Sequence, residues 1–243
     1  VNNFTQTSQF SKTGCRLNWI SGLSINKIVK IINGNRRNLG YKYFSWNCDR
    51  GLLSKNKLDD IKLFADRHKP HFMAISEVNL TRNETIENGI SFSEFSTENA
   101  KETFKIEGYR LIFPASWQIY NKARIIVYIN DQIKAKVINV LQDEDYLQQI
   151  SLEVGFGKVK THNVNFYYRE WKSLITGENS SEAQEREFSK LTNIWRRLTA
   201  EPKDFIALGD TNIDMFKMED PTYAQRNLAD ILKDFLMEES CYQ

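Results

Sequence analysis

The stretch HFMAISE, residues 71–77, decides how this chain folds, because it is an almost uninterrupted apolar run that closes on a carboxylate. Such runs are typical of strands that are buried on both faces of a sheet. The stretch DFIALGD, residues 204–210, has the same character, and YKYFSWN, residues 41–47, is an aromatic, alternating strand that ends on an amide. We therefore predict a core of strands that each end abruptly in a polar side chain.

The rest of the chain supplies more strands and a few helices that lie between them. Apolar residues recur at helical spacing after the capping residue Ser54 and again over residues 181–200 and 222–239. Further strands are predicted at residues 108–113, 123–129, 134–141, 149–154 and 164–168. Residues 81–103 are predicted to be a long surface loop with a short helical piece. This order favours an α/β (α+β) layered domain over residues 39–243, preceded by a leader or linker at 1–38 with one short helix.

Composition excludes several classes of protein. The 243 residues carry a net charge of +2 and a mean hydropathy of −0.52, which is ordinary globular composition. No run reaches the roughly 18 apolar residues that a membrane-spanning helix needs. The start has no charged region followed by an apolar one, so we predict no signal peptide and no secretion. The three cysteines are far apart and are predicted to be free thiols in a reducing compartment.

The candidate functional residues lie at the polar ends of the three principal strands. Ligands bind where strands end, because the core is rigid there and loops can open. If these strands are neighbours, four side chains converge: Asn47, Glu77, Asp210 and Asn212. Carboxylate and amide oxygens are ligands for Mg²⁺ or Mn²⁺, whose shell substrate phosphate can complete. The alternative is that each residue is a turn former or an exposed side chain.

Four motifs, WNCDRG, ISEVNL, FYYREW and ALGDTNID, occur in this order between residues 46 and 214. In this combination the chain resembles the endonuclease/exonuclease/phosphatase superfamily. It is more closely similar to the apurinic-type endonuclease domain of non-LTR retrotransposons. The resemblance covers residues 40–215 and implies a four-layer αββα sandwich, in which two mixed β-sheets are flanked by helices.

The resemblance also implies an activity, the Mg²⁺- or Mn²⁺-dependent cleavage of a phosphodiester in DNA. Glu77 would be the principal metal ligand, with Asn47 beside it and Asp210 completing the set. Asp210 would also orient or deprotonate the attacking water, and Asn212 would hold a phosphate oxygen or the metal-bound water.

Two neighbouring residues would touch the scissile phosphate, Tyr168 as a catalytic residue and Arg169 as a substrate-binding one. Because side chains alternate along a strand, Tyr167 and Tyr168 point to opposite faces, and only one of them can reach the site. Tyr168 is preferred because the Tyr-Arg pair is the one seen in the relatives.

The chain departs from the superfamily pattern at its end. The closing Ser-Asp-His motif and the strand before it have no counterpart, which predicts a domain truncated at its C-terminal side, with its last strands missing. The leading hypothesis is a retroelement endonuclease that nicks nuclear target DNA for primed reverse transcription, within a longer polyprotein that carries a reverse transcriptase. The alternatives are a non-catalytic or decayed fragment of such a domain, and a phosphatase or phospholipase of the same superfamily.

Overall fold

The computed structural model describes most of the chain after residue 40. The described residues are 41–48, 52, 55–81, 86–87, 90–91, 93–94, 97–119, 121–138, 147–156, 160–169, 180–200, 204–213, 217, 220, 222 and 225–238. The predicted leader at 1–38 lies outside them.

The first sheet uses strands from the N-terminal half of this region. Its order is β1 (Tyr43–Asn47), β2 (Phe72–Thr81), β7 (Lys122–Asn130) and β6 (Tyr109–Ile112), and β5 (Ser93–Glu94) pairs with the end of β2. Strands β1 and β2 are parallel, whereas β7 is antiparallel to both β2 and β6. The short strands β3 (Ile86–Glu87) and β4 (Ile90–Ser91) form a separate pair.

The second sheet uses strands from the C-terminal half. Its order is β11 (Asp204–Asp210), β10 (Lys160–Arg169), β9 (Leu147–Phe156) and β8 (Ala135–Ile138). Strands β10 and β11 are parallel, and the other two pairs are antiparallel. Both sheets are therefore mixed, as predicted.

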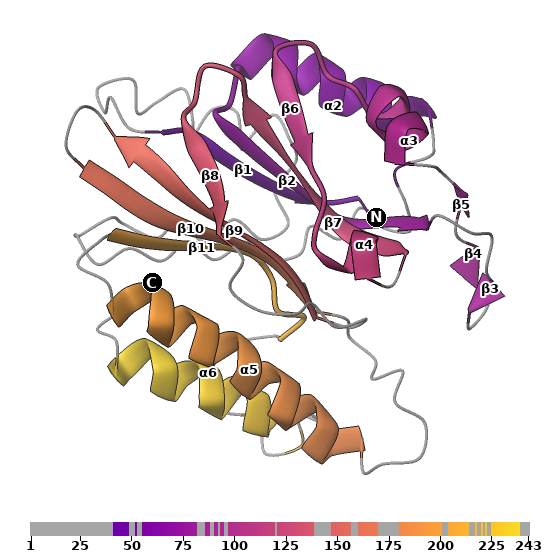
Figure 1. The fold of residues 1–243 in the computed structure, drawn as a ribbon. Coiled ribbons are helices and arrows are strands. Elements are labelled where there is room, and N and C mark those ends of the chain that lie inside the picture. The colour runs from indigo at the N-terminus through magenta and orange to yellow at the C-terminus, as the bar shows by residue number, and fades with distance from the viewer. Residues whose placement is uncertain are drawn as a thin grey trace.

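Helices cover the outer faces of the two sheets, so that the molecule has four layers (Figure 1). Helices α2 (Lys55–His68) and α3 (Thr97–Thr103) lie over the first sheet, and α5 (Ser180–Ala200) and α6 (Arg226–Glu238) lie over the second. The short helix α4 (Ser116–Ile119) precedes β7. The predicted αββα sandwich is confirmed, and among the elements that the sequence did not predict are α4 and the small strands β3, β4 and β5.

Three apolar cores hold these layers together. One lies between α2 and the first sheet, where Phe64 stacks on Phe44 with ring centroids 4.1 Å apart. Another lies between the second sheet and helices α5 and α6, around Trp195 and Phe235. The third lies between the two sheets and includes Phe72 and Phe166. Burial of this apolar surface is the main force that brings the two sheets face to face.

Candidate functional site

The first sheet presents Asn47 and Glu77 from adjacent parallel strands. Asn47 is the last residue of β1 and pairs with Ser76 of β2. The pairing continues one step further, because the Cys48 N–H donates to the Ser76 carbonyl at 3.0 Å. The end of β1 is thus fixed beside Glu77.

Glu77 does not end its strand, as the sequence suggested, but lies in an irregular stretch within β2. Ser76 pairs with Ile125 of β7, and the next pair is Leu80 with Ala123, so residues 77–79 of β2 face the single residue Arg124. Glu77 has φ 58° and Asn79 has φ 48°. Positive φ costs a non-glycine residue about 1–3 kcal/mol, and such strain concentrates at functional sites. The bulge therefore places Glu77 in a strained conformation, of the kind that concentrates at functional sites.

The second sheet presents Tyr168 and Asp210, again from adjacent parallel strands. The two residues are paired directly in the β10–β11 register. Tyr168 is 1% exposed and belongs to the core between the sheets, whereas Tyr167 belongs to the core under α5 and α6. The alternation along β10 therefore turns Tyr168, and not Tyr167, towards the first sheet.

Hydrogen bonds join these four side chains across the two sheets. The Asn47 Nδ2 amide donates to Glu77 Oε1 at 2.8 Å and to Asp210 Oδ2 at 3.1 Å. The Tyr168 hydroxyl lies 3.4 Å from Glu77 Oε1 and donates to it. The Asn47–Asp210 bond thus joins residues that are 163 positions apart in the sequence. We call Asn47, Glu77, Tyr168 and Asp210 the carboxylate cluster.

The loop after β11 is tied to the end of β10. The Asn212 N–H donates to Asp210 Oδ1 at 2.8 Å, and the Asn212 side-chain amide donates to the Arg169 carbonyl. In return, Arg169 Nη1 donates to the Thr211 carbonyl at 2.7 Å. Asn212 also has φ 51°, a conformation that asparagine tolerates better than most residues. Asn212 therefore ties the loop to the end of β10 through its side chain, and its main-chain N–H binds the Asp210 carboxylate.

Arg169 was predicted to contact the scissile phosphate, but the structure does not bring it into the carboxylate cluster. Its side chain is 2% exposed, and the guanidinium carbon lies 5.9 Å from the ring centroid of Phe188 on α5. The physical reason is alternation, because a residue next to Tyr168 in a strand points to the opposite face of the sheet. Arg169 instead stabilises the Asp210–Asn212 loop through its bond to the Thr211 carbonyl.

The donor set of the cluster fits a hard divalent cation. Among the described residues there is no group of three or more His, Cys, Asp or Glu side chains that could hold a metal. The cluster instead offers two carboxylates and one carboxamide, which suits Mg²⁺ because this ion takes few protein ligands and keeps several waters. A zinc site would need nitrogen or sulfur donors, which the cluster lacks.

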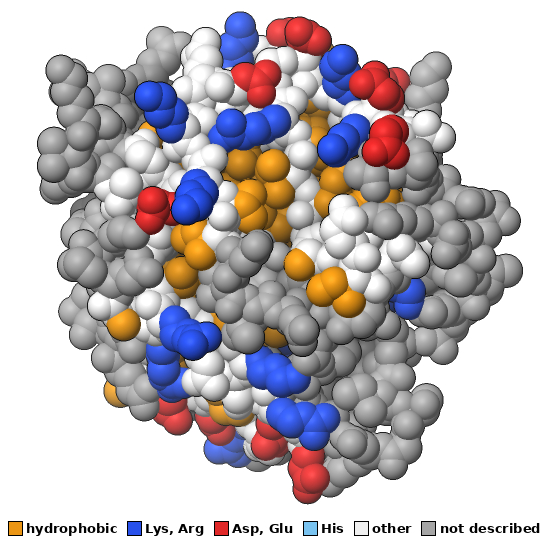
Figure 2. Space-filling model, viewed as in Figure 1, with side chains coloured by type: hydrophobic (Ala, Val, Ile, Leu, Met, Phe, Trp, Pro, Cys, Tyr) orange, Lys and Arg blue, Asp and Glu red, His pale blue; other side chains and the backbone are white. Residues whose placement is uncertain are grey.

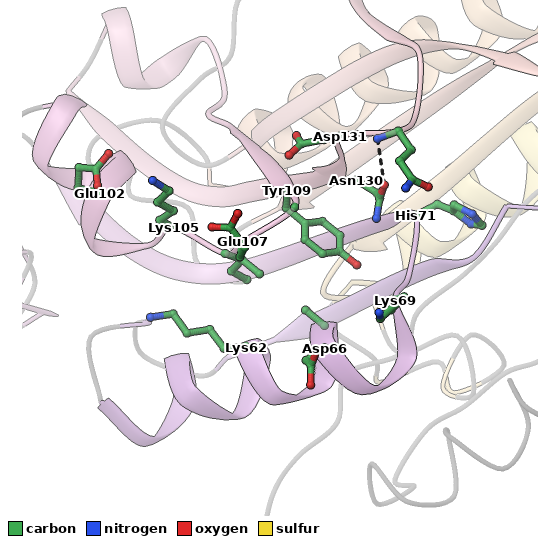
Figure 3. A pocket seen from close by; sticks show the side chains of 14 residues that line it. Lys62, Asp66, Lys69, His71, Glu102, Lys105, Glu107, Tyr109, Asn130 and Asp131 are labelled. Carbon is green, nitrogen blue, oxygen red and sulfur yellow. Dashed lines mark hydrogen bonds between the residues drawn. The ribbon is translucent and has the colours of Figure 1, made fainter.

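A groove of about 980 Å³ lies at the opposite end of the first sheet, near the start of β2 and the end of β7 (Figure 3). It is lined by the basic residues Lys62, Lys69 and Lys105 and the acidic residues Asp66, Glu102, Glu107 and Asp131. Basic and acidic side chains are also interspersed on the face seen in Figure 2. Since a phosphate backbone is attracted by positive charge, the mixed charge of this groove does not favour nucleic acid there.

One buried polar residue beside the cluster escaped the sequence analysis. Gln148 of β9 lies directly opposite Tyr168 in the β9–β10 pairing and is fully buried. The signal was present, because extrapolating the inward alternation of Val154, Leu152 and Ile150 leads to position 148. A glutamine there interrupts an otherwise apolar face.

The fold is similar to that of solved AP endonucleases and of a retrotransposon endonuclease domain, in line with the resemblance of the sequence motifs. An AP endonuclease from Leishmania major superposes with a TM-score of 0.56 at 13% identity, over 82% of this chain and 66% of the enzyme. The endonuclease domain of TRAS1, a telomere-specific non-LTR retrotransposon, gives 0.50 at 16% identity, over 82% of this chain and 72% of that domain. An AP endonuclease from Archaeoglobus fulgidus gives 0.51 at 14% identity, with 82% and 70% covered.

No protein-family model matches the sequence, and no curated protein matches it. The chain spans about two thirds of the length of the Leishmania enzyme.

None of the helices in the described part of the chain has the length and apolar character needed to cross a membrane.

Proposed function

We propose that this chain is a divalent-metal-dependent endonuclease that hydrolyses a phosphodiester bond in DNA. The observation that supports this most strongly is the carboxylate cluster, which joins both sheets of a nuclease-type sandwich through the Asn47 amide. AP endonucleases and a retrotransposon endonuclease domain share this fold. More specifically, we propose that the chain is a retroelement domain that nicks nuclear target DNA, within a polyprotein that also carries a reverse transcriptase.

In this proposal, Glu77, Asn47 and Asp210 would hold a divalent metal ion. When bound there, a Mg²⁺ or Mn²⁺ ion would offset the negative charge that builds up on the phosphate during cleavage. Glu77 is half-buried, and Asn47 is hydrogen-bonded to it, so both metal-binding side chains are in position before any substrate arrives. Such preorganisation lowers the cost of binding and of reaching the transition state.

The remaining residues orient the reacting groups. The Asp210 carboxylate is fixed by donors on both oxygens, and in the reaction it orients the attacking water and accepts its proton. The water oxygen forms a bond to phosphorus while the P–O3′ bond breaks. The departing O3′ takes up a proton from solvent water, and Asp210 returns to solvent the proton that it accepted. The Tyr168 hydroxyl donates to a non-bridging oxygen of the phosphate. The products are a 5′ phosphate and a 3′ hydroxyl that can prime synthesis.

The test is nicking of supercoiled plasmid by the chain in the presence of Mg²⁺. Glu77→Gln should lower the nicking rate by at least about a hundredfold, because an essential metal ligand becomes neutral. Chelation of the metal by EDTA should stop nicking by the wild-type protein. Glu107→Gln is the matched control, because Glu107 is an exposed residue that lines the distant groove.

Two results would contradict the proposal. Nicking by Glu77→Gln at the wild-type rate would remove the cluster from the chemistry. Release of inorganic phosphate from a 3′-phosphorylated oligonucleotide, without any nick, would favour the phosphatase alternative. A fold shared with a 3′ phosphatase from Neisseria, at a TM-score of 0.50, is the reason to run this second assay.

A further inference from the structure

The inward faces of several strands change from apolar to polar at one level of the sandwich. In β10 the apolar residue Phe166 precedes Tyr168, and in β11 Leu208 precedes Asp210. In β9, Ile150, Leu152 and Val154 all lie in the core between the sheets. The next inward position of β9 is Gln148, which pairs with Tyr168 just as Tyr168 pairs with Asp210. Gln148 therefore stands third in a row with two members of the carboxylate cluster.

The Gln148 side chain spans the space between the two sheets. Its Oε1 accepts the main-chain N–H of Arg124 at 2.6 Å. Because a carboxamide accepts hydrogen bonds only through its oxygen, this contact also fixes which end of the Gln148 carboxamide faces β7. Arg124 is the single residue of β7 that faces the bulge of residues 77–79. The bond thus links the sheet of Tyr168 and Asp210 to the strand that backs Glu77.

Stability alone does not explain a glutamine at this position. Gln148 is 0% exposed, and its Nε2 amide is buried without a hydrogen-bond partner in the part of the chain that the structure describes. A buried donor without a partner is unfavourable, and this cost offsets part of what the Oε1 bond to the Arg124 N–H contributes. A residue kept at such a cost beside a reactive cluster points to a role in that cluster.

We propose that Gln148 is a positioning residue, which sets the separation of the two sheets at the cluster and so aligns Glu77 with Tyr168 and Asp210. This inference rests on the proposed nuclease function. The Tyr168–Glu77 contact is long, at 3.4 Å, so it holds the two sheets only weakly at this point. The shorter Gln148–Arg124 bond provides the firmer link on this side of the cluster, and small misplacements of reacting groups are expensive in rate.

The experiment compares Gln148→Met with Gln149→Met. Gln149 is the neighbouring residue on the opposite face of β9, where its Oε1 accepts the Asn165 amide at 2.9 Å in the layer under α5. Each substitution removes one buried acceptor from one buried glutamine, so the two variants are matched. Gln148→Met should lower kcat for plasmid nicking about tenfold and leave KM within about twofold, because alignment and not binding is lost. Gln149→Met should keep kcat within about twofold.

Equal changes of kcat in the two variants would overturn the inference, and so would a loss confined to KM. Hydrogen exchange provides a readout that does not need activity. Exchange at Arg124 and at residues 77–79 should become faster in Gln148→Met than in Gln149→Met. If the wild-type chain nicks no DNA, the proposed function fails, but faster exchange there still supports positioning of Glu77. Unchanged exchange overturns the inference whether or not the chain nicks DNA.

Discussion

Asp210 is held on both sides before any substrate binds. One oxygen accepts the Asn47 amide at 3.1 Å and the other accepts the Asn212 N–H at 2.8 Å. Asp210 is 6% exposed, so these contacts fix the rotation of its carboxylate in a nearly closed environment. In the proposed reaction this restraint would help Asp210 to orient water, because less freedom would remain to be lost at the transition state.

Arg169 provides a test of this restraint at the residue scale. Arg169→Met keeps an apolar stem but removes the donor to the Thr211 carbonyl, which should cost about 1–3 kcal/mol of stability. We expect a lower melting temperature and a lower kcat, because the loop that carries Asp210 is loosened. Arg197→Met, at an exposed position of α5, should leave both unchanged. Loss of DNA binding at an unchanged melting temperature would show instead that Arg169 touches the substrate.

At the scale of elements, the β2 bulge determines how Glu77 is presented. A regular strand would alternate Ser76, Glu77 and Val78 between the two faces. The positive φ at Glu77 and Asn79 breaks this alternation and lets β2 continue to Thr81 while Glu77 reaches Asn47. The carboxylate is thus offered from within a paired strand, where the main chain is anchored on both sides.

Gly209 gives the sharpest prediction about an element. It pairs with Tyr167 across the β10–β11 interface, and a Cβ there would clash with the Tyr167 carbonyl oxygen and lie 2.8 Å from its carbonyl carbon. Gly209→Ala should therefore destabilise the fold by at least about 3 kcal/mol, measured by denaturant unfolding. Gly155→Ala is the matched control in the same sheet, because its nearest neighbour would be 3.9 Å away. A Gly209→Ala variant as stable as Gly155→Ala would contradict the parallel packing described here.

Most elements could be predicted because their signals are local. The apolar runs of β2 and β11 and the amphipathic pattern of α5 are properties of short windows of sequence. The bulge at residues 77–79 could not be predicted, because it is defined only by pairing with β7, more than forty residues later. For the site, Asn47 and Asp210 could be predicted because each lies at the end of a strand. The placement of Arg169 was missed, because the alternation of side chains that was applied to Tyr167 and Tyr168 was not applied to the next residue.

At the scale of the whole molecule, stability should depend on pH through His71. Its Nδ1 accepts the Lys42 N–H at 2.7 Å, which requires the neutral imidazole. Burial, and then the charge of Lys42, lower the pKa of His71 below its ordinary 6.5. Above pH 6.5 the ring is neutral in both the folded and the unfolded chain, so its full contribution is present. Below pH 6.5 the unfolded chain gains a proton that the folded chain resists, and stability falls.

The corresponding measurement is the melting temperature between pH 7.5 and about 5.5, a window above the titration of most carboxyl groups. We expect a decrease in the wild-type protein and a smaller decrease in His71→Asn, whose side-chain oxygen replaces the Nδ1 acceptor without titrating. Identical profiles for the two proteins would remove His71 as the cause.

Each sheet is built from one continuous half of the chain, residues 43–130 for the first and 135–210 for the second. Asn47 and Glu77 belong to one half, and Tyr168 and Asp210 belong to the other. Two separately expressed halves, divided near the turn after β7, would each carry only half of the carboxylate cluster. Any nuclease activity would then arise only by reassembly, so this fold is suited to a split-enzyme reporter in which catalysis signals that two fused partners have met.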